Sequence, residues 1–418
     1  MIKRKLFDAL YAHLPKQEIT MIVGPRQAGK TTLMNSLMDE LNKSGQKTLL
    51  INLDLDEDRV IFSSQLKLLS KIELEIGDQG GYVFIDEMQR LDNAGLFLKG
   101  LYDRNLPYKF IVSGSGSMEL KEKIHESLTG RKQIFELNTL SFEEFVNYKT
   151  GYRYEDKLNQ FYELEPEKTI VLLEEYLNFG GYPRVVLADE LTEKRMLIDE
   201  IYQSYIMRDI AFLLQIQKLD SYSKLIRSLA AQLGNGVNFS ELSKTVGISL
   251  PTVSNYLWYG EKTYILKKLT PYFSNPRKEI TKSPMYYFFD LGFRNYALGL
   301  FGQINRPAEF GFIFENMVLN MIQESLRFTG ALIHYWRTKD GAEVDFVINR
   351  GAKLMPIEVK YKRLKKPAYS RSFFNFINRY NPSDAIVVNL TLDATEKAGN
   401  TQVNFIPYYR LPELLASF

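Results

Sequence analysis

The segment Gly24-Pro-Arg-Gln-Ala-Gly-Lys-Thr31 has the residue types and the spacing of a phosphate-binding loop. It matches the pattern G-x-x-x-x-G-K-S/T, in which glycines let successive backbone N–H groups point at one anion. In this pattern the lysine, Lys30, reaches the terminal phosphates, and the hydroxyl of Thr31 is a ligand of Mg²⁺. The residues that we expect to surround the phosphates of a bound nucleotide are Gly24, Pro25, Arg26, Gln27, Ala28, Gly29, Lys30, Thr31 and Thr32.

Two adjacent carboxylates, Asp86 and Glu87, follow the apolar run of residues 81–85. At the end of a strand, Asp86 is placed to hold Mg²⁺ through water, and Glu87 is placed to orient and deprotonate an attacking water molecule. The other reading of this pair is an acidic turn after a core strand. Because the pair occurs together with the phosphate-binding loop, we expect a site that hydrolyses ATP, with Lys30 and Glu87 as its catalytic residues.

Carboxylates and a lysine also gather near the C-terminal end of the sequence. Residues 343–348 alternate in polarity, so Glu343 and Asp345 are expected on one face of a strand. The other face is expected to carry Val344, Phe346 and Ile348. After a turn, a second strand is expected to carry Glu358 and Lys360 on one face.

A further carboxylate, Glu315, lies on the apolar stripe of a predicted helix over residues 312–322. Burying a charge without a partner is costly. We therefore expect Glu315 to contact a metal ion or Lys360.

The phosphate-binding loop requires a strand before it and a helix after it. Residues 19–23 form an apolar run, and residues 32–41 carry apolar side chains at helical spacing. Further strands are expected over residues 47–53 and 109–115, the second of which ends in small polar residues. These elements form the framework of an α/β domain with a parallel sheet.

This combination of motifs resembles the P-loop ATPases of the AAA type, which have an additional strand and a glutamate beside the aspartate of the second motif. The resemblance implies that Ser113 or Ser115 senses the γ-phosphate. It also implies that Arg131 senses phosphate or acts as a finger toward a neighbouring subunit. The other reading of Arg131 is a surface arginine with a salt-bridge partner. Kinases and GTPases lack this arrangement, so hydrolysis coupled to motion is favoured.

Residues 141–215 are expected to be mainly helical, and they resemble the helical lid of AAA-type proteins. The segment that starts at Ser141 has the pattern of a capping box, and Gly180-Gly-Tyr-Pro-Arg184 interrupts the helical pattern. The resemblance implies that Arg184 or Arg208 reaches back toward the nucleotide.

Residues 238–257 have the pattern of a helix, a turn at Gly247 and a second helix. Strands over residues 264–270 and 285–290 follow, so the segment matches a winged helix-turn-helix. The second helix offers no arginine for reading bases. One reading is a module used for packing or for relaying lid motion. The other is contact with phosphate groups of DNA through Arg277, Lys278 and Lys282.

The set Glu315, Asp345, Glu358 and Lys360 resembles the PD-(D/E)xK fold of restriction endonucleases. In that fold the carboxylates hold Mg²⁺ and the lysine positions or activates water, so Asp345 and Glu358 are the expected metal ligands and all four residues are candidate catalytic residues. The fold also occurs in DNA binders that do not cut. A structural cluster of ion pairs remains an alternative. The basic run of residues 360–366 is either a solvated face or a phosphate contact.

The composition is that of an ordinary soluble globular protein. The 418 residues suggest several domains, and the formal net charge of +3 restricts any nucleic-acid binding to local patches. No cysteine is present, which fits a reducing compartment, and no long apolar run is found. We expect a cytoplasmic protein with no membrane segment.

The expected domains are an ATPase core over 1–140, a lid over 141–215, a winged helix-turn-helix over 216–300 and a nuclease-like domain over 301–418.

As a whole, the sequence resembles a family of prokaryotic AAA-type ATPases with a restriction-endonuclease-like C-terminal domain of unknown role. The resemblance implies an Mg²⁺-dependent ATPase that engages DNA and has a candidate nuclease site, with a homo-oligomer or a partner protein as further possibilities. The alternative is a nucleotide-dependent switch that acts through protein–protein interaction and whose nuclease-like domain is not catalytic.

Overall fold

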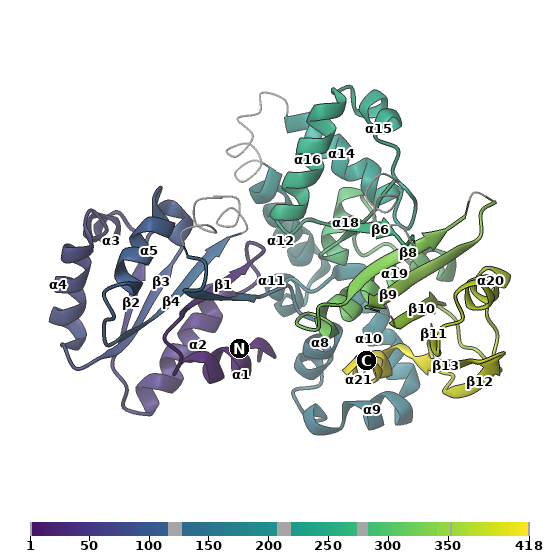
Figure 1. Ribbon diagram of the computed structural model, residues 1–418, viewed down its shortest axis with the longest axis horizontal. Helices are drawn as coiled ribbons and strands as arrows, with labels where there is room; N and C mark the ends of the chain where they lie inside the picture. The colour runs from purple at the N-terminus through teal and green to yellow at the C-terminus, as the bar shows by residue number, and fades with distance from the viewer. Residues whose placement is uncertain are drawn as a thin grey trace.

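The computed structural model describes residues 2–115, 128–206, 219–273, 283–338, 340–351 and 353–416. For Ser115, Leu219, Pro307 and Ala308 only the backbone is described. A parallel sheet with helices on both sides, drawn in purple and blue, lies beside a larger part that contains the helical segment and the C-terminal sheet (Figure 1). The phosphate-binding loop faces the junction of these two parts.

The first sheet has the strand order β2-β3-β4-β1-β5, and every pairing in it is parallel. Its strands are β1 (Ile19–Gly24), β2 (Thr48–Asn52), β3 (Gly81–Asp86), β4 (Tyr108–Ser115) and β5 (Lys132–Glu136). β4 lies between β1 and β3, so it separates the strand before the phosphate-binding loop from the strand that ends in Asp86. Because parallel strands end at the same edge, the loop, the carboxylates and the polar end of β4 meet there.

Helices cover both faces of this sheet because its apolar side chains alternate in direction. Phe84 packs with Leu33 and Leu37, whereas its neighbours Val83 and Ile85 pack on the opposite face. Elements of the first part besides its strands are α1 (Leu6–His13), α2 (Lys30–Lys43), α3 (Asp56–Ile61), α4 (Gln65–Ile76), the 3₁₀ turn η1 (Met88–Arg90) and α5 (Ala94–Tyr102).

A helical segment follows the first sheet, as the sequence predicts. Its elements are α8 (Phe142–Lys149), η2 (Glu155–Lys157), α9 (Leu158–Leu164), α10 (Pro166–Phe179), α11 (Pro183–Leu187), α12 (Leu191–Ser204) and α14 (Leu219–Ala231). The predicted capping box is present, since the Ser141 side chain accepts from the Glu144 N–H and the Glu144 side chain accepts from the Ser141 N–H.

The turn between α10 and α11 contains two glycines, and a different structural constraint favours glycine at each position. Gly180 has a left-handed φ of 72°, which disfavours other residues. A Cβ atom on Gly181 would lie 2.3 Å from the carbonyl oxygen of Leu140. The pair therefore lets the chain approach α8 and then present Pro183 and Arg184.

The predicted helix-turn-helix elements are present as α15 (Phe239–Val246) and α16 (Leu250–Lys262), with Gly247 in the left-handed conformation between them. β6 (Leu266–Pro271) and β7 (Met285–Phe288) follow as an antiparallel pair. Residues 274–282, which include Arg277, Lys278 and Lys282, lie outside the described residues. The assignment of these elements to a DNA-contacting winged helix stays a prediction.

The second sheet is mixed and has the order β12-β13-β11-β10-β9-β8-β6-β7. Its remaining strands are β8 (Leu332–Arg337), β9 (Glu343–Arg350), β10 (Lys353–Val359), β11 (Asp384–Asn389), β12 (Ala394–Ala398) and β13 (Thr401–Pro407). The helices of this region are α18 (Leu291–Ala297), α19 (Pro307–Ser325), α20 (Arg371–Tyr380), η4 (Tyr408–Arg410) and α21 (Leu411–Ala416). Since β6 pairs with β8, the sheet continues across the domain boundary predicted at residue 300.

One predicted face of β9 is wrong. Phe346 and Ile348 pack together in one hydrophobic cluster, but Val344 packs in another one with Val347. The ladder between β8 and β9 shifts its register between His334 and Trp336. An irregularity of this kind breaks strict alternation, and the sequence pattern alone did not show it.

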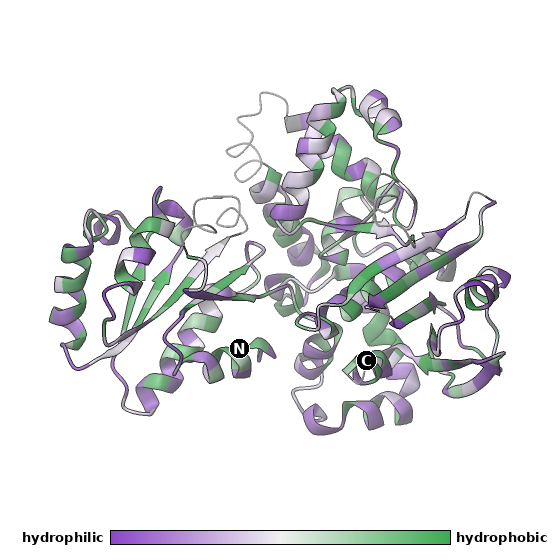
Figure 2. Ribbon diagram, in the orientation of Figure 1, coloured by the Kyte–Doolittle hydropathy of each residue, from purple (hydrophilic) through white to green (hydrophobic). Residues whose placement is uncertain are grey.

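The strands of both sheets are mostly apolar, whereas many helices are apolar on one side and polar on the other (Figure 2). This distribution places the hydrophobic cores between the sheets and their covering helices. Among the described residues, none of the helices combines the length and the apolar character needed to cross a bilayer.

Candidate functional site

The phosphate-binding loop lies between the end of β1 and the start of α2, as the sequence predicts. Gln27 and Gly29 have left-handed φ angles of 57° and 94°. Such angles turn neighbouring N–H groups toward a common point, and the N-terminus of α2 adds its positive dipole end. The loop borders a cleft of about 1720 Å³ that is also lined by residues of the N-terminal segment and of the helical segment.

Lys30 and Thr31 are held by groups of the same site. The buried Lys30 Nζ donates hydrogen bonds to the carbonyl oxygens of Gly24 at 3.1 Å and Pro25 at 2.8 Å. The Thr31 hydroxyl donates to Asp86 Oδ2 at 2.6 Å. The first and second motifs, 55 residues apart in sequence, are therefore in direct contact.

Asp86 also receives hydrogen bonds from the polar end of β4. The Ser113 hydroxyl donates to Asp86 Oδ1, and the Glu87 N–H contacts the same oxygen at 3.0 Å and Ser113 Oγ at 3.3 Å. Ser113 is fully buried, so in this structure it holds the aspartate. The side chain of Ser115, the alternative phosphate sensor, lies outside the described residues.

Glu87 differs from Asp86 in its backbone and in its partner. It has a left-handed φ of 57°, a conformation that costs a residue other than glycine free energy and that recurs at functional sites. Its carboxylate accepts a hydrogen bond from the Gln89 amide, and it borders the cleft. The turn therefore separates two consecutive carboxylates into one buried against Thr31 and one facing the cleft.

The oxygen atoms of Thr31 and Asp86 are suitable ligands for Mg²⁺, which prefers hard oxygen donors. Within the part of the chain that the structure describes, no three acidic or histidine side chains form a group able to hold a metal ion. Mg²⁺ commonly takes one or two protein ligands and completes its shell with water and phosphate oxygens. The residues at this edge of the sheet fit that mode.

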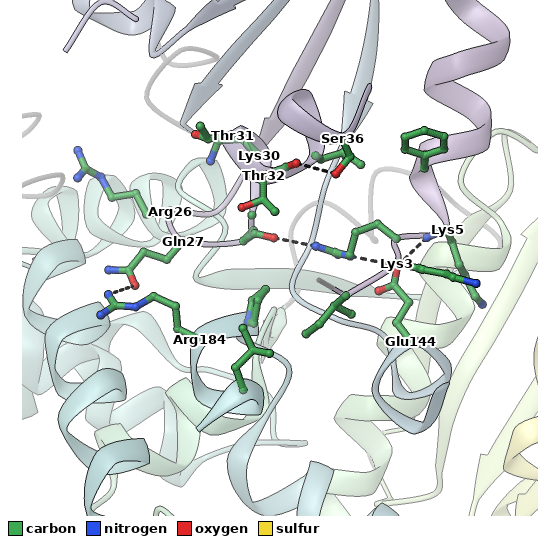
Figure 3. A pocket seen from close by; sticks show the side chains of 18 of the residues that line it. Lys3, Lys5, Arg26, Gln27, Lys30, Thr31, Thr32, Ser36, Glu144 and Arg184 are labelled. Carbon is green, nitrogen blue, oxygen red and sulfur yellow. Dashed lines mark hydrogen bonds and ion pairs between the residues drawn. The ribbon is translucent and has the colours of Figure 1, made fainter. Parts of the chain in front are cut away.

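The helical segment contacts the phosphate-binding loop through residues of α11 and α12 and through Tyr205. Arg184 Nη1 donates to Gln27 Oε1 at 2.9 Å and pairs with Glu200 at 2.8 Å, and Figure 3 shows Gln27 and Arg184 facing one another. Arg184 therefore reaches the loop, while Arg208 lies outside the described residues. A further contact joins the Tyr205 hydroxyl, which accepts, to the Arg26 N–H at 2.7 Å. Sequence reasoning did not assign Tyr205 to the site, because no spacing rule relates residues so distant in sequence.

The prediction that Arg131 contacts the phosphates of this chain's own nucleotide is wrong. Arg131 precedes β5, and its carbonyl oxygen accepts from the N–H of Ile19, the first residue of β1. It therefore lies at the edge of the sheet opposite to the phosphate-binding loop. Its guanidinium group pairs with Asp103 at 2.7 Å, as the surface reading predicts. A role toward a neighbouring subunit stays a prediction.

In the C-terminal region, Asp345 and Glu358 lie on the paired strands β9 and β10, and each has a protein partner. Asp345 Oδ2 accepts from the Val359 N–H at 2.7 Å. Both carboxylate oxygens of Glu358 accept from the Ser370 N–H, at 3.2 and 3.0 Å, and Glu358 pairs with Lys360 at 3.3 Å. These contacts tie β10 to β9 and to the start of α20.

The structure gives Glu315 a partner other than Lys360, which pairs with Glu358 instead, while contact of Glu315 with a metal ion stays a prediction. The Tyr287 hydroxyl on β7 donates to Glu315 Oε1 at 2.5 Å. Burial of the carboxyl group raises the pKa of Glu315 to about 7, and nearby Glu343 adds to the shift. Burial, together with Glu315 close by, also raises the pKa of Asp345 well above its usual range. The two carboxyl groups are thus close enough to influence one another.

Part of the basic run after β10 is also paired. Arg363 makes a bidentate contact with Glu167 near the start of α10, with distances of 2.6 and 3.0 Å. Arg363 therefore joins the C-terminal region to the helical segment, which reduces the charge that the run presents to solvent.

Comparison with known protein families gives three matches along the chain. Residues 16–146 match the family model described as an AAA domain. Residues 170–304 and 310–411 match two domains of unknown function, DUF8612 and DUF4143. Neither of these two descriptions assigns an activity.

Relatives are found in a bacterium and in an archaeon. An uncharacterized protein of Mycobacterium tuberculosis is 26% identical over 362 residues, which are 86% of this chain and 73% of that protein. An uncharacterized protein of Methanocaldococcus jannaschii is 27% identical over 342 residues, which are 79% of this chain and 72% of that protein.

Among solved structures, the ORC1 protein of Aeropyrum pernix in complex with DNA gives a TM-score of 0.31 at 12% identity and covers 70% of this chain and 91% of that chain. The replication initiator DnaA bound to AMPPCP and single-stranded DNA gives a TM-score of 0.30 at 16% identity and covers 63% of this chain and 90% of that chain. Likeness at these TM-scores says nothing about what this chain binds.

The matched residues, the strand order and the contacts among Thr31, Asp86 and Glu87 define the first part of the chain as a P-loop ATPase domain of the AAA type. The PD-(D/E)xK assignment of the C-terminal region, contact with DNA and the binding of Mg²⁺ stay predictions.

Proposed function

We propose that this protein binds ATP with Mg²⁺ in the cleft between the phosphate-binding loop and the helical segment, and that it hydrolyses ATP there. The observation that carries the proposal is the continuous set of contacts from Thr31 through Asp86 to Ser113 and Glu87. It joins the expected metal ligand, the second motif and the polar end of β4 at one edge of the sheet.

The roles of the residues follow from their positions. Lys30 neutralises charge on the terminal phosphates after leaving the carbonyl oxygens that it now contacts. Thr31 and Asp86 hold Mg²⁺, whose charge stabilises the phosphates and the leaving group. Glu87 orients a water molecule and accepts its proton. Arg184 contacts Gln27, so it links the conformation of the helical segment to that of the phosphate-binding loop.

The same cleft has apolar surface for the base of the nucleotide. Ile2, Phe7, Pro183 and Leu187 line it together with the loop residues. An aromatic base gains free energy by covering such side chains. We expect the base to lie between the N-terminal segment and α11.

The test of this proposal separates binding from hydrolysis. Lys30→Ala removes a cation from the phosphates, so it weakens ATP binding by at least tenfold. Glu87→Gln keeps the size of the side chain but removes the base, so ATP binding persists and turnover falls about 100-fold or more. Lys71→Ala, on α4 and paired with Glu75, is the matched control and leaves both quantities unchanged. Unchanged turnover in both site variants would refute the assignment.

A second proposal is that the C-terminal region engages DNA and cuts it. It is supported by the placement of Asp345 and Glu358 on adjacent strands, with Glu315 on α19 close to Asp345. The protein partners of these carboxylates favour the competing reading, a structural cluster. We expect nicking that depends on Mg²⁺ or Mn²⁺ and that Glu358→Ala abolishes. If duplex, single-stranded and branched DNA all stay intact, the cluster is structural.

The alternative function is a nucleotide-dependent switch whose output is binding to another protein. It is supported by the low net charge and by the absence of arginine from the sequence of α16. ATP turnover measured with and without DNA discriminates the two functions. Stimulation by DNA, together with salt-sensitive DNA binding that weakens when Arg277 and Lys278 are changed, argues against the switch.

A further inference from the structure

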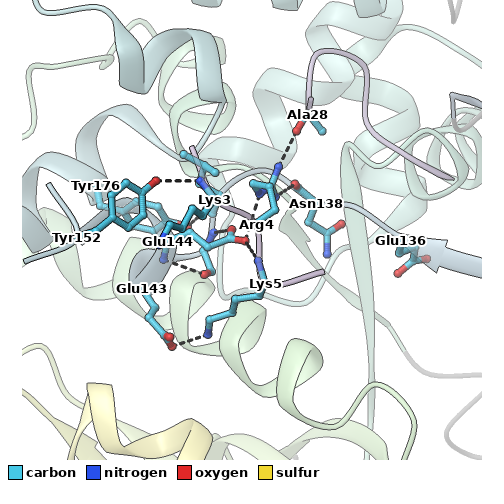
Figure 4. Close-up of polar contacts among 12 residues, drawn as sticks. Lys3, Arg4, Lys5, Ala28, Glu136, Asn138, Glu143, Glu144, Tyr152 and Tyr176 are labelled. Carbon is cyan, nitrogen blue, oxygen red and sulfur yellow. Dashed lines mark hydrogen bonds and ion pairs between the residues drawn. The ribbon is translucent and has the colours of Figure 1, made fainter. Parts of the chain in front are cut away.

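The guanidinium group of Arg4 joins three segments at the junction of the two parts of the molecule (Figure 4). Nη1 donates to the carbonyl oxygen of Ala28 at 2.7 Å, and Nη2 donates to that of Asn138 at 2.6 Å. Nε donates to Glu144 Oε1 at 3.1 Å. The side chain of Arg4 is only 8% exposed, and that of Glu144 is also 8% exposed.

The three partners belong to segments that an ATPase of this kind must coordinate. Ala28 lies in the phosphate-binding loop, Asn138 lies in the connection after β5, and Glu144 lies in the first turn of α8. Glu144 Oε2 accepts from the Ser141 N–H at 2.9 Å, and Oε1 also accepts from the Lys5 N–H at 2.8 Å. The same carboxylate therefore caps α8 and holds Arg4.

The contact with Ala28 acts on the peptide group that precedes Gly29. A trans peptide is planar, so its C=O and N–H bonds point in opposite directions. When Arg4 holds the oxygen of Ala28, it also directs the N–H of Gly29 to the opposite side. Gly29 is the last residue before α2, and its N–H is one of those expected to bind phosphate.

Hydrogen bonds on the two sides of a peptide group strengthen one another. A phosphate that accepts from the Gly29 N–H makes the Ala28 oxygen a better acceptor for Arg4. The guanidinium group is planar and always charged, so a stronger hydrogen bond to Ala28 on one side also affects its contact with Glu144 on the other. A lysine ammonium group does not have this geometry.

We propose that Arg4 is a positioning residue that sets the phosphate-binding loop and couples its occupancy to α8. This inference rests on the proposed binding of ATP. Arg4 acts through the loop and does not itself touch the nucleotide in this account. The segment before α1 therefore belongs to the proposed ATP site.

The lysines on either side of Arg4 line the same cleft, so the control is a lysine away from it. Lys3 pairs with Glu155 at 2.6 Å across the same junction, with side chains that are 64% and 38% exposed. Lys5 pairs with Glu143, also at an exposed position. Exposed ion pairs contribute little to stability. Lys71→Gln, on α4 and paired with Glu75, therefore removes an exposed cation away from the cleft without changing the contact with Ala28.

The experiment measures two quantities in the full chain, namely ATP affinity by calorimetry with Mg²⁺ and the hydrogen exchange of residues 142–149 with and without ATP. In the wild type, ATP slows exchange in α8. Arg4→Gln weakens ATP binding about tenfold or more and abolishes the ATP-dependent change in exchange. Arg4→Lys recovers part of the affinity but not the coupling. Lys71→Gln behaves as the wild type.

The outcomes separate this inference from the proposed function. If the wild type does not bind ATP, the proposed function fails and this inference fails with it. If the wild type binds ATP but Arg4→Gln keeps its affinity and its exchange response, Arg4 has only a structural role. If ATP binds to the wild type but does not change the hydrogen exchange of α8, the proposed coupling between the loop and α8 is overturned. Should Arg4→Gln not fold, Arg4→Lys and Glu144→Gln are measured in the same way, and wild-type behaviour of both overturns the proposal.

Discussion

At the scale of single residues, the site depends on how two neighbouring carboxylates are separated. Asp86 is 2% exposed and is surrounded by the hydroxyl groups of Thr31 and Ser113, whereas Glu87 leaves the strand in a left-handed conformation and faces the cleft. The buried position of Asp86 beside two hydroxyl groups is suitable for a metal ligand. The access of Glu87 to the cleft is suitable for a general base. The identity of both residues was predictable from the motif, but the role of Ser113 as a support of Asp86 required the structure.

Ser113→Ala tests this supporting role. The substitution removes a hydroxyl donor from the buried Asp86, so the carboxylate is less well oriented toward the metal. We expect the kcat for ATP to fall about tenfold, with a smaller change in KM. Steady-state phosphate release measures both quantities. Ser44→Ala, an exposed position where the hydroxyl contacts Leu41, is the control, and equal kcat values for the two variants contradict the role.

At the scale of elements, the sequence predicts the strands and helices around the motifs because each motif has an obligatory context. The strand before the loop, the helix after it and the capping box at Ser141 lie where they are expected. Long-range contacts were not predictable in this way. Arg4 contacts Ala28, and Tyr205 contacts Arg26 across 179 residues, without any periodic pattern that relates them. The register shift in β9 likewise depends on its partner strand.

The glycine turn before α11 provides a prediction about an element. In Gly181→Ala the new Cβ atom would overlap the carbonyl oxygen of Leu140, so α11 and α8 must move apart. Overpacking of this kind costs about 1–3 kcal/mol. We expect a lower thermal midpoint and weaker ATP binding. Gly311→Ala, in α19 with no atom within 4 Å of the new Cβ, is the control and is neutral or stabilising. A midpoint for Gly181→Ala as high as that of the control contradicts the packing argument.

At the scale of the whole molecule, the two parts are joined by several contacts around the cleft and beside β5. Arg327, two residues after the end of α19, pairs with Glu136 at the end of β5 at 2.8 Å, close to the buried Lys267. The C-terminal sheet incorporates β6 and β7, so the strands that follow the helix-turn-helix belong to the same sheet as the C-terminal region. The sequence predicted separate domains there because each has its own local pattern, and pairing between strands of different segments leaves no local signal.

Lys267 makes the stability of this junction depend on pH. Burial lowers the pKa of Lys267 to about 7, and the groups that face it are Glu136, Glu324, Arg327 and the ring of Phe289 at 4.4 Å. Between this pKa and the ordinary value of 10.5, the unfolded chain binds a proton that the folded chain does not, so stability rises with pH in this window. Lys267→Met removes this contribution. We expect the difference in urea midpoint between variant and wild type to shrink from pH 7 to pH 9. A difference that does not depend on pH contradicts the assignment.

The central claim is that the site formed by the phosphate-binding loop, Asp86 and Glu87 hydrolyses ATP. The most direct measurement is phosphate release from ATP and Mg²⁺ by the wild-type protein and by Glu87→Gln, at ATP concentrations that saturate both. The account predicts turnover by the wild type and a fall of about 100-fold or more in the variant, with ATP still bound. Equal phosphate release by the two proteins, or no release by a wild type that binds ATP, would contradict it.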